Sequence, residues 1–380
     1  MQKYIQTEKQ WIDETWEKIE KKLERVSVTS RDKIPYSTEN GVHDDCSSWE
    51  GKRKPEQWTN GFWPGMMWLM YIATGKEQYK ETAEIAEGKL DTVLTKYDYL
   101  SHDMGFMWHL SSGANYRITK NEKSRERNLM AASHLACRYN PDGHFIRAWN
   151  AKERAGWAII DCMMNLPLLY WASEDTEDPR FRQIAMHHAD KTLQNHIRPD
   201  GSVYHILEYD VNTGELLGTP SSQGYDPESS SWTRGQGWAI YGFALSYIHT
   251  GEQRYLNAAK RVAHYFISAV CNEGYVPYID FRAPDEPLRY DTTAGALAAC
   301  GLLEIAKAVP EYEKKLYFKA AVKILKALES EHCNWEENED SILQNGSERY
   351  GRGEHIPIIY GDYYFVEALY KLKGYDMLLW

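Results

Sequence analysis

The sequence predicts an all-α protein folded as an (α/α)6 barrel, a six-hairpin toroid in which an inner ring of helices lies within an outer ring. Two kinds of segment alternate along the 380 residues, one amphipathic and one apolar on nearly every side, and each kind occurs six times. A helix with one apolar stripe lies at the surface, whereas a helix that is apolar all round is buried. Repeated helical hairpins are typical of a closed toroid or of an open array.

The amphipathic segments form the predicted outer ring. Charged residues cover one face of each, and apolar residues recur at i, i+3 and i+4. We expect Gly75 and Gly251 to end the helices that precede them, and Asp178 before Pro179 to cap the start of another. The predicted outer helices lie near 5–25, 74–90, 124–139, 176–193, 250–267 and 309–325.

The apolar segments form the predicted inner ring. They are rich in glycine and alanine, which lets neighbouring helices approach closely. Between helices, 201–209 and 274–280 have weak strand character and are expected to form short hairpins in loops. The predicted inner helices span 61–73, 104–119, 156–172, 235–249, 293–309 and 360–372. We expect one catalytic domain over residues 1–380.

Composition excludes several classes of function. The net charge is −11 and the basic residues are dispersed, whereas a nucleic-acid partner would require a basic stripe. No apolar run is long enough for a membrane span, and the start of the chain has no apolar leader. Six scattered cysteines favour a reducing compartment, and the cytoplasm is the expected location. A small-molecule substrate is the expected partner.

In a toroid, the N-termini of the inner helices converge on one mouth. These ends carry partial positive charge and unpaired N–H groups, which suit an anionic ligand. Polar and aromatic residues recur where the predicted inner helices begin, as in "WTNGFWPG" and "SSSWTRGQGW". The sequence therefore predicts a polar binding pocket at this mouth.

Asp161 and Asp103 are the leading acid/base candidates. Asp161 falls inside the third predicted inner helix, surrounded by apolar residues, where a carboxylate needs a partner or a chemical role. Asp103 precedes the second, and capping that helix is its alternative role. If the two acids face each other, repulsion and desolvation would raise the pKa of one of them, so that it stays protonated.

A second cluster suits a carboxylated sugar. Arg234 and Trp238 lie one helical turn apart, so a guanidinium and an indole would share one face. An arginine ion pair and a core tryptophan are the alternative interpretation. His205 and Gln223 lie in loops expected near the same mouth.

Five segments closely resemble the unsaturated glucuronyl hydrolases of glycoside hydrolase family 88. They are "WTNGFWPGMMWLMYIATG", "HDMGF", "GWAIIDCMMNLPLLYWAS", "SSWTRGQGWAIYGFALSYIHTG" and "YGDYYFVEAL". The resemblance spans about 58–369 and implies an (α/α)6 barrel. It also implies removal of the 4,5-unsaturated glucuronic acid that polysaccharide lyases leave at a non-reducing end, by hydration of its double bond.

The resemblance implies roles for individual residues. Asp161 matches the general acid/base and Asp103 the second essential carboxylate. His102 flanks that carboxylate, and no metal or organic cofactor is implied. The remaining residues match positions near the reacting ring, positions that hold the uronate, or aromatic contacts: His205, Gln223, Arg234, Trp238, Trp149 and Trp58.

The resemblance leaves the substrate open. Some members bind sulfate through a serine and lysine cluster in a C-terminal loop. Here the comparable stretch, 344–355, contains Ser347, Arg349 and Arg352 but no lysine. An unsaturated rhamnogalacturonyl hydrolase of the same fold and a non-catalytic helical sugar-binding protein remain alternatives.

Overall fold

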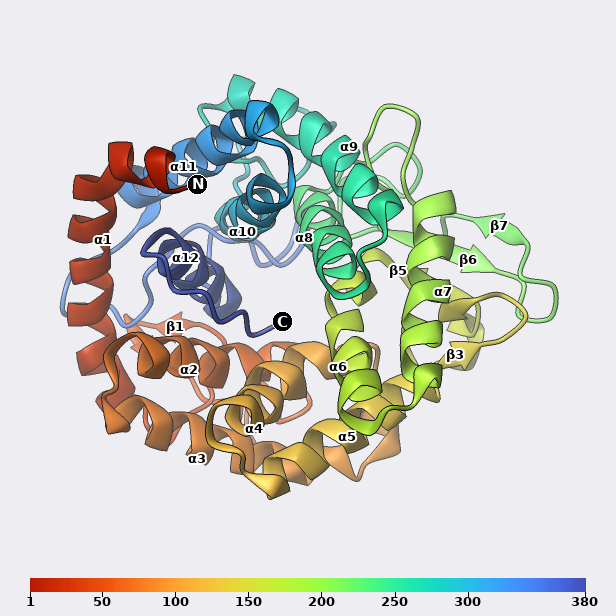
Figure 1. Ribbon diagram of the computed structural model, residues 1–380, viewed down its shortest axis with the longest axis horizontal. Helices are drawn as coiled ribbons and strands as arrows, with labels where there is room; N and C mark the ends of the chain where they lie inside the picture. The colour runs from red at the N-terminus through yellow and green to blue at the C-terminus, as the bar shows by residue number, and fades with distance from the viewer.

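A ring of helical hairpins dominates the computed structural model, which describes residues 1–380 (Figure 1). The outer helices are α1 (Gln2–Thr29), α3 (Glu77–Leu94), α5 (Glu122–Ala136), α7 (Pro179–Asn195), α9 (Gln253–Val270) and α11 (Glu311–His332). The inner elements are α2 (Phe62–Thr74), a π-helical segment Gly105–Gly113 continued by α4 (Ala114–Thr119), α6 (Leu166–Thr176), α8 (Thr233–Thr250), α10 (Thr292–Ala308) and α12 (Ile359–Leu372). The predicted (α/α)6 barrel is confirmed.

The ends of several helices form as local chemistry predicts. Gly75 and Gly251 follow α2 and α8 in the left-handed conformation, with φ of 69° and 72°. The Asp178 carboxylate accepts a hydrogen bond from the Arg180 N–H at 3.0 Å and caps α7, whose first residue is Pro179. Proline is tolerated there because the first helical N–H has no partner within the helix.

The third inner helix begins later than predicted. Residues 157–159 form strand β5 instead, a 3-10 turn (Ile160–Met164) follows, and α6 begins at Leu166. Pairing of β5 with β6 draws this stretch out of the helix, and Pro167 favours a helix start at its own first turn. The prediction that Asp161 lies within an inner helix is therefore wrong, because the residue lies in the turn before it.

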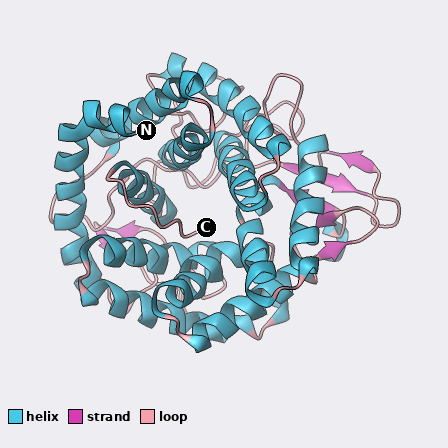
Figure 2. Ribbon diagram, in the orientation of Figure 1, coloured by secondary structure: helices cyan, strands magenta, loops and turns pink.

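Short strands lie in loops and outside the ring beyond α7 (Figure 2). They form three antiparallel sheets: β1 (Thr38–Glu39) with β2 (Val42–His43), β3 (Tyr139–Asn140) with β4 (Phe145–Ile146), and β5 (Trp157–Ile159) with β6 (Ile206–Tyr209) and β7 (Leu216–Gly218). The predicted hairpin near 201–209 is thus part of a sheet. The stretch 274–280 forms only isolated bridges.

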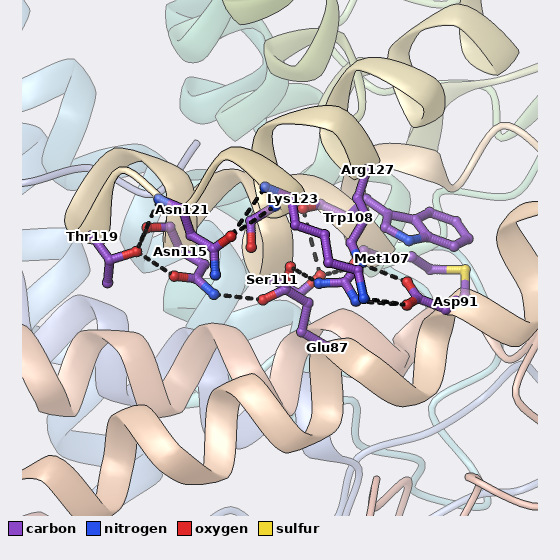
Figure 3. A network of polar contacts seen from close by, with 11 residues as sticks. Glu87, Asp91, Met107, Trp108, Ser111, Asn115, Thr119, Asn121, Lys123 and Arg127 are labelled. Atoms are coloured by element: carbon purple, nitrogen blue, oxygen red, sulfur yellow. Dashed lines mark hydrogen bonds and ion pairs between the residues drawn. The ribbon is translucent and has the colours of Figure 1, made fainter.

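One hydrophobic core of 100 buried residues includes side chains of both rings. A polar network stabilises the second hairpin within it (Figure 3). Arg127 of α5 pairs with Glu87 of α3 at 2.9 Å and with Asp91 at 2.6 Å, and the Asn115 amide of α4 donates to Glu87 at 2.7 Å. These contacts join two outer helices to the inner element that follows Asp103. No helix of the chain combines the length and the apolar character needed to cross a membrane.

Candidate active site

A pocket of about 550 Å³ opens where the inner helices begin. This volume is within the range of small-molecule sites. Its lining residues come from loops and helix starts around the ring: Tyr36, Lys52, Arg53, Lys54, Glu56, Gln57, Trp58, His102, Asp103, Trp149, Ile159, Asp161, Gln223, Arg234, Glu348, Arg349, Arg352 and Tyr360. The pocket therefore lies at the mouth that the sequence predicts.

Asp103 and Asp161 line this same pocket from neighbouring hairpins. Burial is the largest cause of a raised pKa at Asp103. His102 and a hydrogen bond from Ser101 oppose the rise, and the charge of Asp161 adds to it. The Asp103 carboxyl accepts a hydrogen bond from the Ser101 hydroxyl at 2.8 Å and makes no hydrogen bond to a backbone N–H of the helix that follows. The carboxyl of Asp103 is therefore not a helix cap.

Asn165 links the segments that carry Asp103 and Asp161, a role that no sequence pattern indicates. Its amide oxygen accepts a hydrogen bond from the Phe106 N–H at 2.8 Å, and its amide nitrogen donates to the Asp161 carbonyl at 3.3 Å. Gly105 permits the close approach, because a Cβ there would lie 2.7 Å from the Cα of Asn165. One buried side chain thus fixes the start of the second inner element against the turn that carries Asp161.

The β5–β6 sheet places His205 beside Asp161. Ile159 pairs with Ile206, and the Ile160 N–H donates to the His205 carbonyl at 3.0 Å. The His205 Nε2 consequently lies 3.5 Å from the Asp161 Oδ1. On the other acid, the His102 Nε2 lies 3.2 Å from the Asp103 Oδ1. Each acid therefore has its own histidine.

Arg234 is nearly fully engaged by the protein. One terminal nitrogen donates to Asp291 at 2.8 Å and to the Ser347 carbonyl, and the other donates to the Glu348 carbonyl and to Gln223 at 3.4 Å. Only Nε has no partner. Arg234 lines the pocket, but most of its donors fix the 344–355 loop and Gln223 at the pocket wall, and a role in holding a carboxylate stays a prediction.

Trp238 does not line the pocket. Its indole is fully buried and packs edge-on against Trp58, with ring centroids 6.3 Å apart, and against Phe106 at 5.1 Å. The alternative interpretation, a core tryptophan, describes its position. Trp58 and Trp149 do line the pocket, and Trp149 meets the His102 ring edge-on at 5.7 Å.

Sequence reasoning missed part of the wall. Tyr36 and Glu348 are joined by a 2.6 Å hydrogen bond, and Arg53 lies over the Tyr36 ring while pairing with Glu348 at 2.8 Å. These residues come from loops far apart in the chain, so no spacing pattern could have associated them. Tyr360 also lines the pocket, at the start of α12.

Six basic side chains line the pocket, against the four acidic side chains of Glu56, Asp103, Asp161 and Glu348. Arg53, Arg234 and Lys52 are paired with Glu348, Asp291 and Glu39. The side chains of Lys54, Arg349 and Arg352 make no ion pair or hydrogen bond within the protein. In a chain of net charge −11, this local excess of positive charge favours an anionic ligand.

Comparisons with known proteins show the family to which the chain is similar. The model of Glycosyl Hydrolase Family 88 matches residues 26–379. An unsaturated glucuronyl hydrolase from Bacillus sp. (strain GL1) is 40% identical over 327 residues, 83% of this chain and 86% of that protein. An unsaturated chondroitin disaccharide hydrolase from Streptococcus pyogenes serotype M1 is 36% identical over 325 residues, 83% of this chain and 81% of its own.

A solved structure resembles the whole ring. The crystal structure of an unsaturated glucuronyl hydrolase from Bacillus sp. GL1, responsible for the degradation of glycosaminoglycan, matches with a TM-score of 0.83 and 36% identity, covering 92% of this chain and 95% of the other. The chain therefore belongs to Glycosyl Hydrolase Family 88 and is a glycosidase.

Proposed function

We propose that the protein removes a 4,5-unsaturated glucuronic acid from the non-reducing end of oligosaccharides made by polysaccharide lyases. The observation that carries the proposal is the pair Asp103 and Asp161, which line one pocket with an excess of cations. Residues 1–380 would act as one catalytic domain. The six cysteines are all unpaired, which supports a reducing compartment such as the cytoplasm.

Asp161 acts as the proton donor and then as the acceptor. Its O–H bond breaks as a C4–H bond forms on the sugar, which leaves positive charge shared by C5 and the ring oxygen. A water oxygen then bonds to C5, and the water proton passes to the Asp161 carboxylate, so the acid is regenerated. The resulting hemiketal opens and releases the shortened sugar and a keto-uronic product. General acid catalysis of this kind contributes about 100- to 10,000-fold in rate.

The rest of the pocket binds the sugar. Trp58 and Trp149 offer aromatic surface for the sugar faces, and Gln223, held by Arg234, offers an amide. Lys54, Arg349 and Arg352 attract the uronate and any acidic group on the next sugar. Glycosaminoglycan fragments, which the relatives above act on by name, fit this charge.

Hydrolysis of unsaturated disaccharides tests the proposal. The conjugated double bond absorbs ultraviolet light, and hydration removes that absorbance. A panel of sulfated and unsulfated glucuronyl disaccharides is compared with a rhamnose-linked unsaturated product. We expect turnover of at least one glucuronyl substrate. Turnover of the rhamnose-linked product alone, or of none, would contradict the proposal.

Replacement of the acid tests its role. We expect Asp161→Asn to lower turnover about 100- to 10,000-fold while the unfolding temperature changes little. Asp190→Asn, a surface aspartate that pairs with Arg254 at 2.7 Å, is the matched control and should keep full activity. An Asp161→Asn enzyme with normal turnover would assign the proton to another group.

A further inference from the structure

Two buried histidines contact the two acids in opposite ways. The His205 Nδ1 accepts a hydrogen bond from the Gln223 backbone N–H at 2.9 Å, and its Nε2 faces Asp161. The His102 Nδ1 lies 3.1 Å from the Ala148 carbonyl oxygen, and its Nε2 faces Asp103. Neither Nε2 has a hydrogen-bond partner of good geometry, so the carboxyl oxygen is its nearest polar contact. The backbone partner of each Nδ1 therefore decides what its Nε2 presents to the carboxyl.

The backbone partners fix the protons. An amide N–H only donates, so the Nδ1 of His205 is bare and the ring carries its proton on Nε2, toward Asp161. A carbonyl only accepts, so the Nδ1 of His102 carries a proton. A neutral His102 ring then turns a bare nitrogen toward Asp103. Asp161 therefore faces the Nε2–H of His205, whereas Asp103 faces the lone pair on the Nε2 of neutral His102.

A lone pair cannot face an ionised carboxylate at 3.2 Å without repulsion. A proton on either atom removes this repulsion: on the ring it gives imidazolium and carboxylate, and on the acid it gives imidazole and carboxylic acid. In both forms the His102–Asp103 pair carries no net charge. Burial raises the pKa of Asp103, which agrees with a proton retained at this position.

Arg138, Cys162 and His188 do not take that proton. Arg138 donates to the carbonyls of Leu100, Arg147 and Ala148 and to Asn150, and makes no ion pair with Asp103. Burial raises the pKa of the Cys162 thiol well above its ordinary value, and lowers the pKa of His188 to about 3, so both stay neutral. Asp161 also raises the pKa of Asp103, and in the proposed reaction its own proton goes to the sugar.

We propose that His102 is a positioning residue that keeps one proton on the His102–Asp103 pair, so that this pair meets the anionic substrate without net charge. The inference rests on the proposed function, because it gives the two carboxyls different tasks in one reaction. As positive charge develops at C5, the shared proton moves from the Asp103 Oδ1 to the His102 Nε2. A carboxylate then faces the developing cation, and no proton leaves the pair.

Nitrogen NMR of histidine-labelled enzyme tests the proton positions without substrate. His102→Gln and His205→Gln assign the two signals by their loss. We expect His205 to be neutral with its proton on Nε2, and His102 to carry its proton on Nδ1, with an Nε2 signal that moves on Asp103→Asn. His188 is an internal reference, since its Nδ1 accepts the Ile146 N–H at 3.0 Å and no carboxyl faces it. A His102 that carries only an Nε2 proton, or ignores Asp103→Asn, would overturn the inference.

Kinetics then separates a proton-holding role from a structural one. His102→Gln removes the site for the shared proton, so we expect kcat to fall about 10- to 100-fold and the pH profile of kcat/KM to change shape. The matched control His188→Gln should leave that profile unchanged. An unaltered profile in folded His102→Gln would contradict the proposal. If no unsaturated disaccharide is turned over, the proposed function fails, while the NMR result still decides where the proton lies.

Discussion

The buried ionisable groups at the two ends of the barrel differ in how completely they are paired. At the pocket end, the Oδ1 of Asp161 and the Nε2 atoms of His102 and His205 lack hydrogen bonds of good geometry. Toward the other ends of the inner helices, Lys371 lies 2.7 Å from Glu367 and 3.0 Å from Glu304. Each charged side chain of that cluster has an oppositely charged partner. Incomplete pairing thus marks the end where a substrate can complete it.

The last residue of the chain contacts this paired cluster. The chain ends inside the ring (Figure 1), and the indole of its last residue, Trp380, donates to Glu367 at 3.0 Å. Lys371 also donates to Tyr241 at 2.6 Å. Burial disfavours its charge, but Glu304 and Glu367 hold the pKa of Lys371 above its ordinary value. The paired charges stabilise the fold at this end.

Removal of Lys371 should have the largest effect on stability. Lys371→Met leaves Glu367 buried without its cation and Glu304 with Lys307 alone, and loss of one partner from a buried pair costs about 3–5 kcal/mol. Urea unfolding measures the difference. Lys307→Met is the matched control: Lys307 pairs with the same Glu304 at 3.1 Å, but its side chain is 40% exposed, so its loss should cost about 1 kcal/mol or less. Equal losses of stability in Lys371→Met and Lys307→Met would show that the buried pairing of Lys371 does not stabilise this end of the barrel more than an exposed ion pair does.

Asn165→Ala should act mainly on catalysis. It removes both hydrogen bonds that join the Phe106 backbone to the Asp161 backbone. We expect kcat to fall about tenfold or more through misplacement of Asp161, with a stability cost of about 1–3 kcal/mol. Asn128→Ala, a buried asparagine that contacts His109, is the control for stability alone. A normal kcat in Asn165→Ala would disprove the linking role.

The free cations of the pocket should affect substrate affinity. We expect Arg349→Gln and Arg352→Gln each to raise KM about two- to fivefold at low salt, with a smaller difference at high salt because screening weakens exposed charges. Lys21→Gln changes net charge equally on the outer helix α1 and should leave KM unchanged. A rise in KM that does not depend on salt would indicate the loss of a packing contact with the substrate instead of a charge interaction.

The sequence predicted the ring because burial patterns follow helical periodicity, and it predicted the mouth because inner-helix starts converge there. It placed Asp161 in a helix because strand β5 exists only through its pairing with β6, about fifty residues away. It grouped Arg234 with Trp238 because they lie one turn apart. Their environments differ through distant partners, Asp291 for the arginine and Trp58 for the indole. The histidine tautomers likewise depend on the backbone atoms of Ala148 and Gln223, which local spacing does not reveal.

The smallest expected effect concerns pH and the stability of the pocket end. The pKa of Asp103 is raised above its ordinary value of 3.8, so the folded chain holds a proton that the unfolded chain releases as pH rises. The stabilisation from this carboxyl is complete below about pH 4 and is lost as pH rises through the folded pKa. The free energy of unfolding of the wild type, relative to Asp103→Asn, should therefore decrease with increasing pH. Urea unfolding of both proteins over a pH series measures it. A relative stability that increases with pH would mean that Asp103 is ionised more readily folded than unfolded, which would contradict both its burial and the proton it shares with His102.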